Sequence, residues 1–122
     1  YLLFPPVLGK ITNRFNAQTG HFGVDVGAAK DATIKSIDEG TVIIAAYTAE
    51  TGHIIQIQHD NDMISVYKHN SVLLKKEGEK VRAGEAIAII GQAGEFSTGP
   101  HLHFEMWRNG VALNPESFFS FE

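Results

Sequence analysis

Apolar and polar residues alternate over short stretches of the chain, and helical periodicity is almost absent. In residues 53–59, Ile55 and Ile57 fall on one face of an extended segment, whereas Gln56 and Gln58 fall on the other. Further short apolar stretches occupy residues 41–47, 63–69, 85–91 and 101–107. Because these stretches have the length and period of strands, they predict an all-β fold.

Gly, Asn and Asp residues separate the predicted strands and indicate tight turns between them. The sequence Asp-Asn-Asp at 60–62 predicts a hairpin that pairs residues 53–59 with residues 63–69. Residues 92–100 are predicted to form a loop. A proline at a helix-starting position predicts one closing turn within residues 114–119.

Length and composition restrict the classes of function. The 122 residues suffice for a modest core, and because no linker divides them, residues 1–122 are interpreted as a single domain. The formal net charge is −4 and the ten Lys and Arg residues are scattered, so no nucleic acid partner is expected. The absence of Cys excludes a disulfide framework, a thiolate metal site and a cysteine nucleophile. No apolar run approaches the roughly 20 residues of a transmembrane segment.

The chain begins at Tyr1 rather than at Met, and it is therefore interpreted as a mature or trimmed fragment. This interpretation leaves room for an N-terminal domain, an anchor or a signal sequence that the segment itself lacks.

Residues 98–106, Thr-Gly-Pro-His-Leu-His-Phe-Glu-Met, place two histidines one residue apart inside an apolar stretch. If this stretch is a strand, His101, His103 and Glu105 point to one side, while three apolar residues fill the other. A half-exposed strand with two polar positions is the simpler interpretation, but Thr or Lys would serve that purpose equally well. Two imidazoles at consecutive outward positions favour a rigid metal-binding platform.

The sequence Gly-His-Phe-Gly-Val-Asp at 20–25 places His21 and Asp25 four residues apart. In a flat strand these residues would lie about 13 Å apart, whereas zinc holds imidazole nitrogen and carboxylate oxygen at about 2 Å. If both residues bind one metal, the chain must bend between them, and Gly23 would allow such a bend. The alternative is a turn followed by a strand on which Asp25 is simply exposed.

Together, His-Phe-Gly-Val-Asp at 21–25 and Thr-Gly-Pro-His-Leu-His-Phe-Glu at 98–105 resemble the signature of the lysostaphin/LytM-type zinc metallopeptidases. Members of this family are murein endopeptidases, which cut peptide cross-links or stems in the bacterial cell wall. The resemblance extends from about Pro6 to Phe119. It implies an antiparallel barrel-sandwich hybrid fold (the duplicated hybrid motif) with a substrate groove. It also implies peptidoglycan peptides as partners and a periplasmic or secreted location in the cell envelope.

The resemblance implies a role for each matching residue. His21, Asp25 and His103 match the ligands of one zinc ion per chain. His101 matches a catalytic histidine that does not bind the metal. His69, within Val-Tyr-Lys-His-Asn at 66–70, matches the other catalytic histidine.

The implied ligand set fits the chemistry of hydrolysis. Two imidazoles and one carboxylate leave the fourth position of a zinc ion open, where water would be activated and the scissile carbonyl polarised. Because histidines titrate near neutral pH, His69 and His101 are expected to divide the roles of base and oxyanion stabiliser, with the assignment left open. Glu105 either orients His103 or acts as a base, and the resemblance favours the orienting role.

Four further residues carry expectations. Lys68 and Asn70 stand where the family more usually has Ala and Leu, which bears on bond preference more than on the class of reaction. Tyr67 is expected on the same face as His69 if the strand is regular. His59, at the end of a predicted strand, is expected to make structural hydrogen bonds rather than to take part in catalysis.

Two other functions compete with hydrolysis. A non-hydrolytic family member would bind peptidoglycan or regulate a cell-wall amidase, but such proteins usually lack metal ligands that this chain retains. Residues 78–92 resemble the turn rhythm of lipoyl and biotinyl carrier domains, yet the modified lysine at a hairpin tip is missing. The sequence therefore predicts a zinc-dependent endopeptidase that acts on peptidoglycan peptides.

Overall fold

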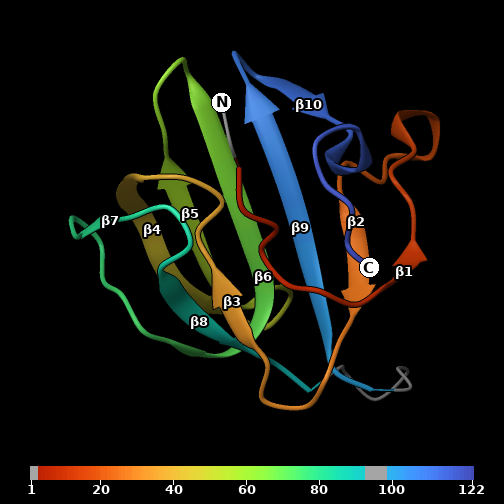
Figure 1. The fold of residues 1–122 in the computed structure, drawn as a ribbon, viewed down its shortest axis with the longest axis horizontal. Helices are drawn as coiled ribbons and strands as arrows, with labels where there is room; N and C mark the ends of the chain where they lie inside the picture. Colours follow the sequence, from red (N-terminus) through yellow and green to blue (C-terminus); the bar gives the residue numbers. More distant parts are fainter. Residues whose placement is uncertain (1–2, 93–98) are drawn as a thin grey trace.

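The structure, a computed structural model, describes residues 3–92 and 99–122 and consists mainly of β-strands (Figure 1). The strands are β1 (Lys10–Asn13), β2 (Val24–Gly27), β3 (Thr33–Lys35), β4 (Gly40–Thr48), β5 (Gly52–Gln58), β6 (Met63–Leu73), β7 (Lys80–Val81), β8 (Ala86–Ile90), β9 (His101–Arg108) and β10 (Val111–Leu113). Two 3₁₀ turns, η1 (Ala17–Thr19) and η2 (Pro115–Ser117), are the helical segments of the described chain. Within these residues, no helix has the length and hydrophobicity to span a bilayer.

The strands pair antiparallel in the order β1-β2-β9-β6-β5-β4-β7. β10 adds to β9, and β3 joins the sheet through β8, which pairs with β6. In Figure 1, β3 and β8 cross in front of the main sheet, so the long strand β6 contributes to both layers. The sheet is open, with β1 and β7 at its edges, and the prediction of an all-β, antiparallel fold is confirmed.

The hydrophobic core lies between these layers. Tyr67 of β6 and Phe104 of β9 are fully buried, and their ring centroids lie 5.3 Å apart. Ile34 of β3 and Ile87 of β8 belong to the same buried cluster. The three apolar residues that alternate along β9, Leu102, Phe104 and Met106, are all inaccessible to solvent. The polar residues between them consequently face away from the core, as the alternation predicts.

The five predicted strand segments coincide with observed strands, and their ends differ by a few residues. β6 extends beyond the predicted end at residue 69, to Leu73, because its last residues pair with β8. The predicted closing turn is η2, capped by the side chain of Asn114. Most of the predicted loop at 92–100 lies outside the described residues, and the interpretation of residues 1–122 as one domain stays a prediction.

Candidate metal centre

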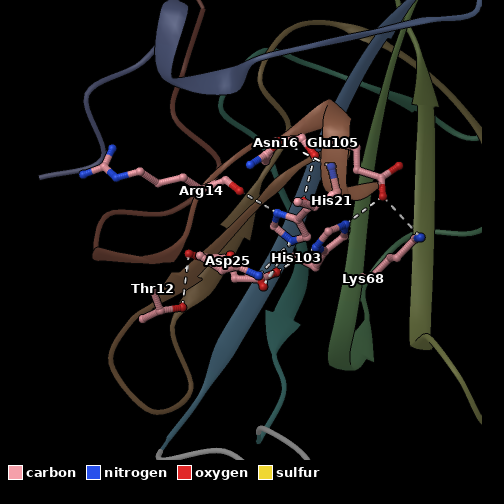
Figure 2. Close-up of polar contacts among 10 residues, drawn as sticks. Thr12, Arg14, Asn16, His21, Asp25, Lys68, His103 and Glu105 are labelled. Atoms are coloured by element: carbon pink, nitrogen blue, oxygen red, sulfur yellow. Dashed lines mark hydrogen bonds and ion pairs between the residues drawn. The ribbon is translucent and has the colours of Figure 1, made fainter.

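Three side chains predicted as metal ligands, His21, Asp25 and His103, meet on the face of the sheet opposite the core (Figure 2). β2 and β9 pair so that Asp25 lies opposite His103. Asp25 Oδ1 lies 2.7 Å from His103 Nδ1, and Asp25 Oδ2 lies 3.3 Å from His21 Nε2. One donor atom from each residue lies within 4.8 Å of the other two, so a single cation can contact all three.

A turn before His21 brings this residue back toward β2. Asn16 caps η1 with its side-chain oxygen, and Gly20 follows with a left-handed φ of 81°. Backbone hydrogen bonds between Asn16 and His21 then close the loop. Gly23 is required for close approach: a Cβ there would lie 2.4 Å from the Phe104 carbonyl oxygen, so a larger residue would push the segment away from β9.

Hydrogen bonds fix which nitrogen of each imidazole faces the cluster. His21 Nδ1 lies 2.7 Å from the Arg14 carbonyl oxygen, to which it donates, so the lone pair is on Nε2. His103 Nε2 donates to Glu105 Oε2 at 2.7 Å, so Nδ1 is the nitrogen directed at Asp25. Two imidazole nitrogens and one carboxylate are presented together, and this donor set suits Zn²⁺.

When no metal is bound, the charges around His103 determine the protonation of His103 and of the two carboxylates beside it. Burial alone would lower the pKa of His103, but its hydrogen bonds with Asp25 and Glu105 raise that pKa to about 9. Burial would raise the pKa of Glu105, but hydrogen bonds from His103 and Trp107 lower it to about 2. The pKa of Asp25 is also lowered, since the hydrogen bond from His103 and nearby positive charge outweigh the effect of burial. A cation that binds His103 Nδ1 must therefore displace a proton.

The two predicted catalytic histidines lie beside the same cluster. His69 is exposed, and its ring centroid lies 6.3 Å from that of His103. Partial desolvation of its ring is the main cause that lowers the pKa of His69, and the positive charge on His103 lowers this pKa further. The neutral imidazole is therefore favoured. His101 lies two residues before His103 on β9, and its Nδ1 donates to the Gly99 carbonyl oxygen at 2.7 Å.

One expected orientation is wrong, because β6 is irregular near His69. Tyr67, expected on the face of His69, instead points into the core, where its hydroxyl accepts the N–H of Ile37 at 3.2 Å. His69 has a left-handed φ of 69°, and the register between β5 and β6 shifts between His53 and Ile55. This bulge turns the His69 side chain to the face of the sheet that carries His21, Asp25 and His103, and it leaves the Tyr67 side chain in the core.

Glu105 has two neighbours, Lys68 and Trp107, that are not predicted from the sequence. Lys68 Nζ lies 3.3 Å from Glu105 Oε2, and Trp107 Nε1 donates to Glu105 Oε1 at 2.8 Å. Strand alternation could have placed Trp107 on the face of Glu105. Lys68 reaches Glu105 only because the register of β6 and β9 sets Lys68 opposite His103, and that register is not readable from the sequence.

Comparison with known proteins identifies the family. The model of Peptidase family M23 matches residues 19–115. The murein hydrolase activator NlpD of Escherichia coli is 36% identical over 112 residues, which cover 90% of this chain and 29% of NlpD. The peptidoglycan DD-endopeptidase ShyC of Vibrio cholerae is 34% identical over 113 residues, which cover 93% of this chain and 25% of ShyC. A crystal structure of a zinc-containing peptidase from Vibrio cholerae superposes with a TM-score of 0.81 and 28% identity, covering 93% of this chain and 39% of that chain.

These matches concern one part of larger proteins, because the chain spans less than a third of the length of the curated relatives it matches. The matched segment contains His21 and Asp25 as well as His101 and His103. The resemblance to the lysostaphin/LytM-type family is thereby confirmed. The chain belongs to peptidase family M23.

Proposed function

We propose that this chain is a zinc-dependent endopeptidase domain that hydrolyses peptide bonds in peptidoglycan stems or cross-links. The observation that carries the proposal is the convergence of donor atoms from His21, Asp25 and His103 within 4.8 Å, beside His69 and His101. Membership of a peptidase family supports hydrolysis as the reaction. The name of ShyC, a peptidoglycan DD-endopeptidase, supports peptidoglycan as the class of substrate.

In this proposal His21, Asp25 and His103 hold one Zn²⁺. When bound, the ion supplies the Lewis acidity that activates a water molecule and polarises the scissile carbonyl. Glu105 keeps His103 in the tautomer whose Nδ1 is available to the metal. The Arg14 carbonyl oxygen does the same for Nε2 of His21.

His69 and His101 carry out the proton and charge steps. One imidazole takes a proton from the attacking water and returns it to the leaving amine. The other stabilises the negative charge that develops on the carbonyl oxygen of the scissile bond. Either histidine can take either role, since both lie beside the cluster.

The proposed place of action is the cell envelope, in the periplasm or outside the cell, where peptidoglycan peptides occur. Glycyl bridges, D-Ala to diaminopimelate links and stem bonds are all candidate substrates. Each contains a peptide bond, so the metal and the two histidines serve all three, and the surrounding groove selects among them.

A second candidate function is a non-hydrolytic protein that binds peptidoglycan or regulates a cell-wall amidase. The observation that favours it is the 36% identity to NlpD of Escherichia coli, which is named a murein hydrolase activator. Against it stands the complete set of converged metal donors, His21, Asp25 and His103, which a purely regulatory surface does not need.

Zinc analysis and muropeptide digestion together test the proposal. The chain is refolded with zinc, its metal content is measured, and the products of defined muropeptides are identified by mass spectrometry. We expect stoichiometric zinc, and products that correspond to the gain of one water across one peptide bond. A zinc-loaded chain that leaves every muropeptide intact but stimulates an amidase would replace this proposal with the second candidate function.

A further inference from the structure

A groove of about 430 Å³ lies on the outer face of the sheet, beside the candidate metal site formed by His21, Asp25 and His103. Alternate residues of three neighbouring strands line it: Ile54 and Gln56 of β5, Ile64, Val66 and Lys68 of β6, and Glu105 and Trp107 of β9. Ile54 and Val66 are buried, yet they are not part of the cluster between the two layers. They form a separate apolar floor, and the volume suits a short peptide.

Lys68 lines the groove and supplies a positive charge there. Figure 2 shows its ammonium beside the Glu105 carboxylate, next to His103. Its Nζ lies 3.3 Å from Glu105 Oε2, but that oxygen already accepts the shorter 2.7 Å hydrogen bond from His103. The other oxygen, Oε1, accepts from Trp107 Nε1 at 2.8 Å. Each Glu105 oxygen therefore has a donor besides Lys68. The Lys68 ammonium has three N–H donors on a side chain that is 27% exposed, so the contact with Glu105 leaves donors for a ligand.

The balance of charge leaves Lys68 in surplus when the proposed metal is bound. The negative charges of Asp25 and Glu105 would then balance the charge of one divalent cation, because the imidazole ligands are uncharged. Lys68 is the positively charged residue of the groove lining, and besides Glu105 the lining contains one more carboxylate, that of Asp62, six residues before Lys68 and directly before β6. Such a site attracts an anionic group on a ligand.

We propose that this groove is a peptide subsite in which Lys68 binds a carboxylate of the bound peptide, which makes Lys68 a specificity-determining residue. The identity of the peptide rests on the proposed function. Stem peptides of peptidoglycan carry free carboxylates, such as the α-carboxylate of γ-linked D-glutamate. In the proposed complex, apolar parts of the peptide pack against Ile64 and Trp107 and the carboxylate pairs with the Lys68 ammonium.

The single tryptophan of the chain, Trp107, lies in this groove and reports binding through its fluorescence. The zinc-loaded chain is titrated in a stopped-flow instrument with a stem peptide that contains γ-linked D-glutamate. A matched peptide contains D-isoglutamine, in which a carboxamide replaces the α-carboxylate. We expect the carboxylate peptide to bind about tenfold more tightly. The binding phase is read before any hydrolysis, so the result does not depend on turnover.

The variant Lys68→Met is expected to bind the two peptides equally, and Lys68→Arg is expected to retain the preference for the carboxylate. Lys76→Met removes an exposed lysine outside the groove and serves as the matched control, with the preference unchanged. The readout is the ratio of the two affinities, because Lys68→Met also alters the surroundings of Glu105. If Lys68→Met weakens both peptides equally and leaves their ratio unchanged, Lys68 acts only through Glu105 and the inference is overturned. Equal affinities in the unsubstituted chain also overturn it.

Failure of this inference and failure of the proposed hydrolysis give different results. A preference for the carboxylate without muropeptide cleavage would contradict hydrolysis and leave the subsite at Lys68 standing. Cleavage without that preference would contradict the subsite and leave hydrolysis standing.

Discussion

Glu105 connects three side chains that approach it from two strands. Its Oε2 accepts from His103 and contacts Lys68, and its Oε1 accepts from Trp107. The residue is 9% exposed, so its charge depends on these partners for stabilisation. Because protein donors occupy both oxygens, the arrangement is that of a group that orients the His103 ring rather than that of a base facing a substrate.

Glu105→Gln is therefore expected to retain zinc and to lower kcat/KM by about 10- to 100-fold. The amide oxygen still accepts one hydrogen bond, but the charge that stabilises the orientation of His103 is lost. Zinc content and kcat/KM on a muropeptide are measured on the same preparation. Near-total loss of turnover with zinc retained would instead assign Glu105 the role of a base.

The histidines around the cluster are expected to respond in two ways to substitution by Ala. His103→Ala removes a donor and should abolish zinc binding. His69→Ala and His101→Ala should retain zinc and lower turnover by about 10²- to 10⁴-fold, the usual contribution of a positioned acid or base. Metal analysis and muropeptide cleavage check each variant. His53→Ala, which removes a histidine outside the cluster, is the control, and normal turnover in His69→Ala or His101→Ala would remove that residue from the mechanism.

Among the strands, the bulge in β6 determines where His69 points. The backbone of His69 is left-handed, and the side-chain amide of Asn70 spans the irregular pairing. Asn70 Nδ2 donates to the carbonyl oxygens of His53 and Tyr67, both at 3.0 Å. Gly91 passes so close that a Cβ there would lie 2.1 Å from the His69 carbonyl oxygen. Contacts from neighbouring segments thus hold a backbone conformation that a non-glycine residue seldom adopts.

Asn70→Ala is expected to lower the free energy of unfolding by about 1–3 kcal/mol, because the carbonyl oxygens of His53 and Tyr67 lose a buried donor. Asn70 Oδ1 is buried without a hydrogen-bond partner in the described chain, so its removal offsets part of this loss. Urea titration measures the change. Val72→Ala, at an exposed position of the same strand, should stay within about 0.5 kcal/mol. An unaltered stability in Asn70→Ala would mean that the strand pairing maintains the bulge without the amide.

The strands could be predicted because they depend on the local order of residues, whereas the grouping of His21 and Asp25 with His103 is implied by the resemblance to a known family. Alternation alone places His101, His103 and Glu105 on one face of β9, opposite the buried apolar residues. The direction of Tyr67 could not be predicted in this way, because a bulge shifts the alternation by one residue and depends on the neighbouring strands. The contact of Lys68 with Glu105 likewise depends on the register between two strands that are distant in sequence.

Across the whole molecule, a buried chain of polar groups connects the two layers. His59 Nδ1 donates to the Glu39 carbonyl oxygen at 2.7 Å, and its Nε2 lies 2.7 Å from Ser65 Oγ. Ser65 Oγ lies 2.8 Å from the Tyr67 hydroxyl oxygen, which accepts the N–H of Ile37. Ile37 and Glu39 lie between β3 and β4, whereas Ser65 and Tyr67 belong to β6. These contacts confirm the structural role predicted for His59.

Acidification is expected to destabilise the fold through His59. Burial lowers the pKa of His59, and the hydrogen bond to the Glu39 carbonyl oxygen opposes this effect only in part. The unfolded chain keeps the ordinary histidine pKa of about 6.5. Between the two pKa values the unfolded state binds a proton that the folded state does not bind. The contribution of His59 to stability is therefore complete above about pH 6.5 and is lost as the pH falls toward the lowered pKa.

His59→Gln tests this linkage, because Gln cannot titrate. Urea unfolding at about pH 8 and about pH 5, with a chelator present, gives the loss of stability for each protein. We expect the unsubstituted chain to lose more free energy of unfolding than His59→Gln over this interval, although the variant is less stable at the higher pH. His69 and His103 titrate in both proteins, so their contributions cancel in the difference. Equal losses would mean that protonation of His59 does not distinguish the folded from the unfolded state.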